Sequence, residues 1–247
     1  MTRNLYNRGK LYYNRGKEEQ IPFVPRPGEG KYRMEEIMEN KAYELFAKRN
    51  NKVRIRVIPG HFVTQHSHVN YCVDMTRIKS EAKLARETAK LFAESFSGVV
   101  IDTILTIDRM KMVGAFLAEE LSNSTGINMN QEIAVISPEF TADEKLILPD
   151  NLVPYVKDRH VLILAATATT GMTAMGAIRG IRYYDGDPVG LATVFGGSFE
   201  IPGVPVKRLI GVEDLPAYAS YRPGECPLCK NSVKIDALIN SYGYSKI

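Results

Sequence analysis

Hydrophobic and polar positions alternate in a short stretch near the start of the chain, and longer apolar runs follow. Residues Val53–Ile58 read VRIRVI, and a period of two is typical of a strand with one buried face. Pro59-Gly60 is expected to end this strand. The run Val161–Ala166 is almost wholly apolar, which indicates a strand that is covered on both faces.

Strand and helix patterns then alternate from about residue 80 to residue 195. Ser80 is the expected N-cap of a helix over residues 80–96, and Gly98 is expected to end it. The other predicted helices are Lys111–Leu121 and Thr173–Arg182, and the other predicted strands are Val69–Asp74, Val99–Thr106, Ile133–Ile136, Val189–Phe195 and Val206–Gly211. This order predicts an α/β fold, a Rossmann-like parallel sheet with helices on both faces.

Ligands bind such sheets beyond the carboxyl ends of the strands. A binding site is therefore expected among four loops, those after Thr106, Ile136, Ala166 and Phe195.

The flanking segments predict an arm and a smaller subdomain. The sequence YNRGK occurs at Tyr6–Lys10 and again at Tyr13–Lys17. We expect an extended arm that packs on its own domain or on a second subunit, although basic residues among tyrosines can also bind phosphates and bases. A helix is expected over Met34–Arg49. The expected boundaries are 1–33 for the arm, 34–80 for a first hood segment, 81–212 for the core and 213–247 for a C-terminal hood segment.

Composition favours a globular protein with a sizeable core. Of the 247 residues, 45% are hydrophobic and 24% are charged, and the net charge is only +4. That charge predicts neither a nucleic-acid nor a membrane partner. Three cysteines do not make a disulfide framework, and the N-terminus lacks an apolar signal core, so a cytoplasmic location is expected.

The sharpest local feature follows the run Val161–Ala166. The next residues read TATTGMT, small and rich in hydroxyls, and a predicted helix follows them. Gly171 lets the backbone approach a ligand closely, and a helix N-terminus favours an anion. The alternative is a plain strand-to-helix turn with threonine capping. The phosphate-binding candidates are Thr167, Thr169, Thr170, Gly171, Met172 and Thr173.

This run resembles the signature of type I phosphoribosyltransferases, in which apolar residues, two acids and two spacers precede Thr-Thr-Gly-x-Ser/Thr. Thr169–Thr173 match that pattern. From residue 53 onward the order of segments is most similar to orotate phosphoribosyltransferases, through Gly60–Val63 with His66, Ser67 and Tyr71, and through the Cys-Pro-Leu-Cys of 226–229. The resemblance implies a phosphoribosyltransferase-type core with a small hood, and a homodimer.

Three departures from the family pattern bear on activity. The acidic pair, which the resemblance implies would bind the ribose hydroxyls of phosphoribosyl pyrophosphate, falls on Ala165 and Ala166. Losing two charge-assisted hydrogen bonds weakens binding by about 3–6 kcal/mol. The family's basic lid corresponds here to Ser137–Asp150, which has one lysine and four acids. The glycine-rich pyrophosphate loop corresponds to a segment with three candidates, Asp108, Arg109 and Lys111; the two cations are also explained as solvated charges.

The expected function is recognition of a 5′-phosphorylated ribose ligand, either a nucleotide or phosphoribosyl pyrophosphate, with standard catalysis in doubt. The hood candidates that face the base are Phe62, His66 and Tyr71. The alternative is an active, divergent phosphoribosyltransferase of nucleotide metabolism that uses Mg²⁺, with Asp102, Asp108 or an acid of the lid in place of the lost pair. No catalytic residue is assigned.

Two groups of residues carry possible metal chemistry. Three histidines lie in the range His61–His68, but no fourth ligand is close in sequence, and a polar loop also explains them. Cys226 and Cys229 form a single CxxC, which is half of a zinc site, a redox pair or a plain turn; Cys72 or a histidine can complete it only through the fold. No metal site is therefore assigned.

Overall fold

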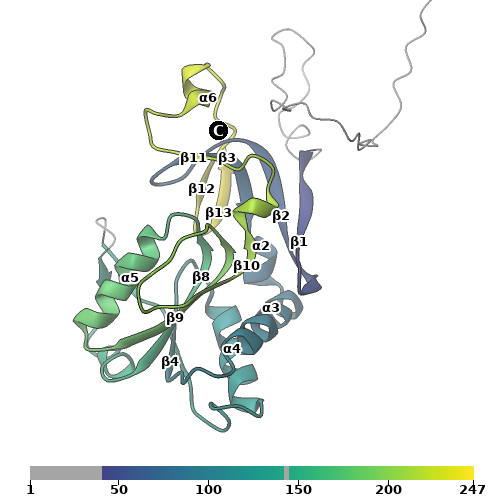
Figure 1. Ribbon diagram of the computed structural model, residues 1–247. Helices are drawn as coiled ribbons and strands as arrows, with labels where there is room; N and C mark the ends of the chain where they lie inside the picture. The colour runs from purple at the N-terminus through teal and green to yellow at the C-terminus, as the bar shows by residue number, and fades with distance from the viewer. Residues whose placement is uncertain (1–40, 142–144) are drawn as a thin grey trace, which may run out of the picture. The chain divides into compact units, whose positions relative to one another are not determined.

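A five-stranded parallel sheet lies at the centre of the computed structural model, which describes residues 41–141 and 145–247 (Figure 1). The strand order is β10-β9-β8-β4-β5, and every neighbouring pair is parallel. The strands are β4 (Thr103–Thr106), β5 (Ala134–Ile136), β8 (His160–Ala168), β9 (Asp187–Gly196) and β10 (Val206–Gly211). The α/β fold expected from the sequence is confirmed.

Helices cover both faces of this sheet. Alternate residues of β8 face opposite sides: Leu162 and Leu164 pack in one core cluster, and Val161 and Ile163 pack in the other. The first cluster includes residues of α3 (Ala82–Ser95) and α4 (Lys111–Asn123), and the second includes residues of α5 (Met172–Tyr183). In Figure 1, α5 accordingly lies on the opposite side of the sheet from α3 and α4. Within the described ranges, no helix is long and apolar enough to cross a membrane.

A second sheet combines strands from the two ends of the described chain. Its order is β11-β3-β2-β12-β13, and β1 pairs with β2. The strands are β1 (Tyr43–Ala47), β2 (Asn50–Val63), β3 (His68–Asp74), β11 (Ser220–Tyr221), β12 (Ala237–Asn240) and β13 (Gly243–Lys246). Ile58, Phe62, Val69, Cys72 and Ala237 form its own small core.

Short elements lie in the connections between the main strands and helices. They are α2 (Thr76–Ser80), β6 (Glu139–Phe140), β7 (Leu146–Ile147), α6 (Pro227–Lys230) and the 3-10 turns Val153–Tyr155 and Val212–Asp214. The helix α2 follows β3 directly, so it carries the chain from the second sheet toward the core helix α3.

Four sequence predictions are wrong in detail. The strand expected over Val99–Thr106 begins only at Thr103. The expected helix over 34–49 fails at Tyr43–Ala47, because those residues pair antiparallel with β2; residues 34–40, like the repeat in 1–33, lie outside the described part. Pro59-Gly60 does not end β2, because a register shift between Pro59 and Phe62 accommodates these two residues within the pairing with β3. Ser80 ends α2 rather than capping α3, whose N-cap is Glu81.

Candidate functional site

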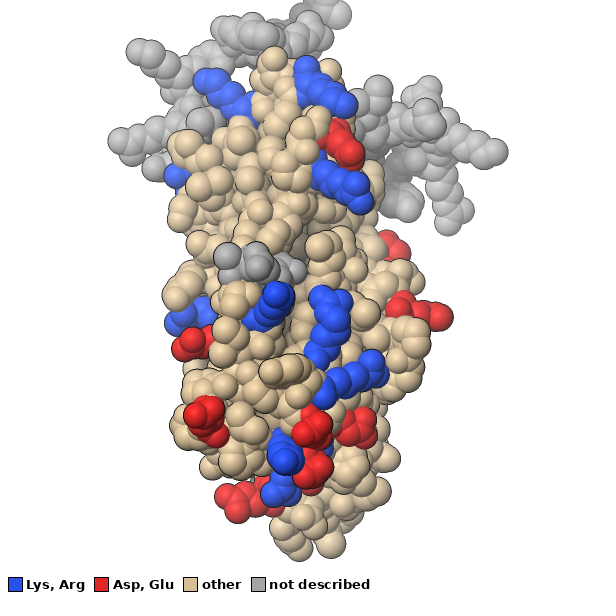
Figure 2. Space-filling model, turned by 90° about the vertical axis from the view of Figure 1, so that its left-hand side faces the viewer, with Lys and Arg blue, Asp and Glu red and all other residues tan. Residues whose placement is uncertain are grey.

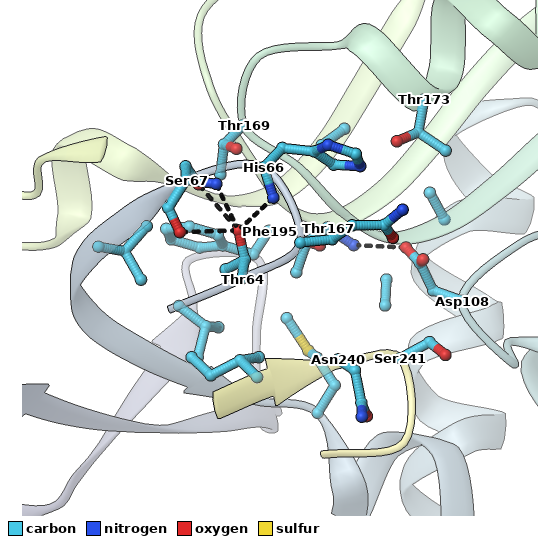
Figure 3. Close-up of a pocket in the computed structure, with 18 of the residues that line it drawn as sticks. Thr64, His66, Ser67, Asp108, Thr167, Thr169, Thr173, Phe195, Asn240 and Ser241 are labelled. Atoms are coloured by element: carbon cyan, nitrogen blue, oxygen red, sulfur yellow. Dashed lines mark hydrogen bonds between the residues drawn. The ribbon is translucent and has the colours of Figure 1, made fainter. Parts of the chain in front are cut away.

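A pocket of about 970 Å³ opens at the carboxyl ends of the parallel strands (Figure 3). The core contributes the segment Ala165–Ala174, together with Ile107, Asp108, Phe140, Thr141 and Phe195. The second sheet and its connections contribute Thr64–Ser67, Val69, Tyr71–Thr76, Lys79, Tyr218, Ser220–Arg222 and Ile239–Tyr244. The pocket is therefore lined by residues at or near the ends of all four strands after which the sequence predicts a binding loop.

The start of α5 lies at the pocket and has a left-handed backbone at its N-cap. Gly171 is the N-cap and has a φ of 74°, a conformation that a residue with a Cβ adopts only under strain. A Cβ at this position would also lie 2.8 Å from the Phe199 ring. The first N–H groups of a helix have no acceptor within the helix. Since Met172, Thr173 and Ala174 line the pocket, this helix start adjoins the cavity.

The candidate hydroxyls accompany this helix start. Thr169, Thr170 and Thr173 line the pocket, as does Thr167, and Thr167 and Thr170 are exposed. The fold thus brings all six phosphate-binding candidates to one wall of the cavity.

Ala165 and Ala166 lie in the strand that leads into this loop. Their side chains are buried on opposite faces of the sheet, Ala165 against the α5 side and Ala166 against the α3 and α4 side. The nearby carboxylate is Asp108, on the loop after β4. Figure 3 shows this carboxylate pointing toward Thr167, whose N–H donates to Asp108 Oδ2 at 3.4 Å. An acidic group therefore lies beside the two alanines.

Asp108 shares the pocket with a half-buried lysine. Burial raises the pKa of Asp108, while Lys79 and the N–H groups of Thr167 and Ala166 lower it. Burial also lowers the pKa of Lys79, and the charge of Asp108 opposes that change. The Lys79 ammonium donates to the Ser241 carbonyl at 2.9 Å, which ties α2 to the C-terminal hairpin of β12 and β13.

Three aromatic rings form another wall. Tyr71 and Tyr218 have ring centroids 6.4 Å apart, and Phe195 meets Tyr218 edge-on at 5.6 Å. The Tyr71 hydroxyl donates to the Pro216 carbonyl at 2.9 Å. Burial raises the pKa of Tyr218, whereas a hydrogen bond with Thr169 lowers it. Tyr218 therefore links the aromatic wall to the threonine-rich loop.

Of the other two hood candidates, only one lines the pocket. His66 lines the pocket from the turn between β2 and β3 (Figure 3). Phe62 does not line it, because its ring is fully buried in the core of the second sheet.

The cations expected in the pyrophosphate loop do not line the pocket. The Arg109 guanidinium stacks on the Tyr242 ring at 4.0 Å, and Lys111 begins α4 with an exposed side chain. Asp108 and Arg109 have φ values of 54° and 64°, so two successive residues that are not glycine adopt a left-handed backbone. That turn directs Asp108, but not Arg109, into the cavity.

The expected lid is a small hairpin of β6 and β7, with Phe140 and Thr141 at the pocket. Leu146 packs against Gly180 of α5. A Cβ added to Gly180 would lie 2.5 Å from the Cβ of Leu146. Glu139 and Asp150 do not line the pocket; Asp143 and Glu144 lie outside the described residues. Figure 2 shows this side of the molecule, where several Lys and Arg side chains (blue) lie near the middle of the face.

Asp102 is excluded as a substitute for the lost acids. It precedes β4, at the amino end of the sheet, and its Oδ2 accepts hydrogen bonds from the N–H and the ring Nδ1 of His160, both at 2.8 Å. The pocket lies at the opposite, carboxyl end.

The fold changes the expectation about metal ligands. Among the described residues, His61, His68, Cys226 and Cys229 bring one ligand atom each to within 4.8 Å of one another. His66 is not in this group, and Cys72 is buried elsewhere, in the core of the second sheet. The two histidines and the two cysteines lie more than 150 residues apart in the sequence, so spacing alone did not indicate that they meet.

Comparisons with known proteins return only solved structures. No protein-family model and no curated protein matches the sequence. Orotate phosphoribosyltransferase of Mycobacterium tuberculosis H37Rv is 21% identical, with 60% of this chain and 83% of that chain covered and a TM-score of 0.44. A phosphoribosyltransferase of Corynebacterium diphtheriae is 20% identical, with 74% and 95% covered and a TM-score of 0.44.

Adenine phosphoribosyltransferase of Trypanosoma brucei is 12% identical, with 76% of this chain and 84% of that chain covered and a TM-score of 0.44. All three of these structures are phosphoribosyltransferases by name. Because the identities and TM-scores are low, these structures assign no function to this chain.

Proposed function

We propose that this chain binds a 5′-phosphorylated ribose ligand, either a nucleotide or phosphoribosyl pyrophosphate, with Thr169–Thr173 around the 5′-phosphate. The observation that supports this most is the left-handed Gly171 at the start of α5, on the wall of a large pocket. Backbone N–H groups at a helix start bind phosphate through hydrogen bonds and through the helix dipole.

The rest of the ligand would extend from this phosphate across the cavity. A volume of about 970 Å³ lies at the upper end of small-molecule pockets, so a nucleotide fits. The aromatic wall of Tyr71, Phe195 and Tyr218 offers faces and edges for a planar base, with His66 nearby. The homodimer and the cytoplasmic location expected from the sequence stay predictions.

The experiment is a calorimetric titration with ribose 5-phosphate and, in parallel, with ribose. The chain should bind the first and not the second, because the loop recognises the phosphate. Thr170→Ala removes one exposed hydroxyl beside that phosphate. A hydrogen bond to a charged group contributes about 1.5–3 kcal/mol, so affinity should fall about 10- to 150-fold.

Thr125→Ala is the matched control, because Thr125 is exposed but does not line the pocket. Its affinity should equal that of the wild type. Equal binding of ribose and ribose 5-phosphate, or equal losses in the two variants, would contradict the assignment of the phosphate.

A second candidate function, an active divergent phosphoribosyltransferase, is favoured by the position of Asp108. A carboxylate accepts hydrogen bonds from a ribose diol, and this one lies beside the alanines where the family has acids. In the reaction, a base nitrogen forms a bond to C1 of the ribose and loses its proton to solvent, while the bond from C1 to pyrophosphate breaks and pyrophosphate leaves with its electron pair. Asp74 and Asp108 line the pocket and offer the oxygen ligands that suit Mg²⁺; Mg²⁺ would neutralise the pyrophosphate.

Asp108→Asn should weaken sugar recognition while stabilising the fold. We expect the preference for ribose 5-phosphate over 2-deoxyribose 5-phosphate to fall about tenfold, the effect of losing one charge-assisted bond. Because burial raises the pKa of Asp108, its contribution to stability is fully present below the unfolded pKa and is lost as pH rises through the folded pKa. The variant should therefore melt at a higher temperature than the wild type at pH 7, and this difference should disappear toward a pH of about 4.

Asp150→Asn serves as the control, because Asp150 is exposed and does not line the pocket. It should change neither the sugar preference nor the melting temperature. The catalytic candidate further requires pyrophosphate release from phosphoribosyl pyrophosphate with Mg²⁺ and a mixture of bases. Release at the same rate in Asp108→Asn and the wild type would rule out this role for Asp108.

A further inference from the structure

Four potential metal ligands meet between the β2–β3 hairpin and the C-terminal segment. His61 lies in β2 and His68 begins β3, while Cys226 and Cys229 lie at the start and within the short helix α6. His61 and Cys226 are buried, and the other two are more accessible. The cluster lies outside the lining of the pocket, so the proposed ligand does not account for it.

Three of the four distances measured within the cluster fit a tetrahedral zinc site, and the fourth is slightly shorter. Zinc binds imidazole nitrogen at about 2.0–2.1 Å and thiolate sulfur at about 2.3 Å, which places tetrahedral ligand atoms roughly 3.3–3.8 Å apart. The Nε2 of His61 lies 3.6 Å from each cysteine sulfur. The Nδ1 of His68 lies 3.3 Å from the Cys229 sulfur and 3.0 Å from Nε2 of His61.

The surroundings orient His61 for coordination. Its Nδ1 lies 2.9 Å from the Val233 carbonyl, so Nδ1 carries the proton that it donates, and Nε2 presents a lone pair to the cluster. Its backbone N–H donates to Asp236 Oδ2 at 2.7 Å. Metal-binding histidines characteristically make such a second hydrogen bond, which fixes the ring and its tautomer.

We propose that His61, His68, Cys226 and Cys229 bind one Zn²⁺ ion that fastens the C-terminal segment to the β2–β3 hairpin. Two thiolates and two imidazoles in a tetrahedron favour zinc among divalent metals. Four protein ligands leave no open coordination position, so the role is structural. On its two sides the ion holds Thr64–Ser67 and Ser220–Arg222, which form part of the pocket wall.

The first test is the metal content of the full chain, purified without chelator or an affinity matrix that carries metal. Mass spectrometry of the metal should find one zinc per chain, and X-ray absorption should find two sulfur and two nitrogen ligands. Substitution by Co²⁺ should give the visible bands of a tetrahedral thiolate site. Absence of zinc, both as purified and after addition of Zn²⁺, would overturn the proposal, as would a Cys226–Cys229 disulfide in the freshly purified protein.

Variants distinguish a metal site from a hydrogen-bonded cluster. Cys229→Ser and His68→Ala alter the more accessible ligands, and each should reduce zinc to less than half an ion per chain. His66→Ala is the matched control, because it lies in the same hairpin outside the cluster; it should retain the full zinc content. Equal zinc in all three variants would overturn the assignment of the ligands. If a variant does not fold, the absorption spectrum of the wild type still decides the question.

The zinc measurements test this inference separately from the proposed function, because none of them uses a sugar phosphate. Zinc present without binding of ribose 5-phosphate would support this inference and contradict the proposed ligand. Binding of ribose 5-phosphate by a protein that cannot take up zinc would do the opposite.

Discussion

Gly171→Val should weaken ribose 5-phosphate binding severely, because the start of α5 is proposed to hold the phosphate. The native φ of 74° is a strained conformation for a residue with a side chain, and the strain costs about 1–3 kcal/mol. A Cβ would also lie 2.8 Å from the Phe199 ring. The loop relieves both effects by moving, which takes the N–H groups away from the phosphate. Calorimetry should find affinity at least about a hundredfold lower, equivalent to about 2.7 kcal/mol.

Gly203→Val is the matched control for this prediction. Gly203 has nearly the same φ, 75°, but a Cβ there would meet nothing within 4 Å. The control should share the backbone strain, and hence some loss of melting temperature, while it retains full affinity. If Gly203→Val weakens binding as much as Gly171→Val does, the loss reflects stability rather than the phosphate contact.

Gly197→Ala should also weaken ribose 5-phosphate binding, although Gly197 lies just after the end of the neighbouring strand β9 and not in the phosphate loop. Gly197 follows β9, and its N–H donates to the Ala168 carbonyl at 2.8 Å. An added Cβ would overlap the carbonyl oxygen of Thr169, which is backbone and cannot turn aside as a side chain can. Overpacking of this kind costs about 1–3 kcal/mol, and its relief displaces Thr169 and Thr170. We expect at least a tenfold loss of affinity together with a lower melting temperature.

Gly98→Ala tests whether any added methyl group has this effect. A Cβ at Gly98 would lie in open space, so affinity and melting temperature should both stay close to those of the wild type. A Gly197→Ala protein that binds ribose 5-phosphate normally would show that the loop between β8 and α5 does not carry the phosphate.

The strands of the core could be predicted from the sequence because their patterns of apolar residues are local. The run Val161–Ala166 is apolar on both faces, and the structure extends it only to His160–Ala168. The predicted strand Val206–Gly211 has the observed bounds. By contrast, Tyr43–Ala47 has apolar residues at helical spacing, yet the chain forms a strand there because pairing with β2 outweighs local preference.

Only part of the candidate site could be predicted from the sequence, because only part of it is formed by one local segment. The loop Thr169–Thr173 follows one strand, so its residues and its place at the end of the sheet could be predicted together. Lys79 and Ser241 meet across 162 residues, and no local pattern in either segment indicates the contact. The four ligands of the proposed zinc site are likewise two separate pairs in the sequence, and only the second sheet brings them together.

Phosphate binding by the loop before α5 is tested most directly by an NMR titration of the isotopically labelled protein with ribose 5-phosphate. We expect the largest amide shifts at Thr169–Ala174, we expect them to saturate, and we expect ribose alone not to cause them. Shifts that concentrate elsewhere, or amides of Thr169–Ala174 that do not respond at saturating ligand, would contradict phosphate binding at this loop.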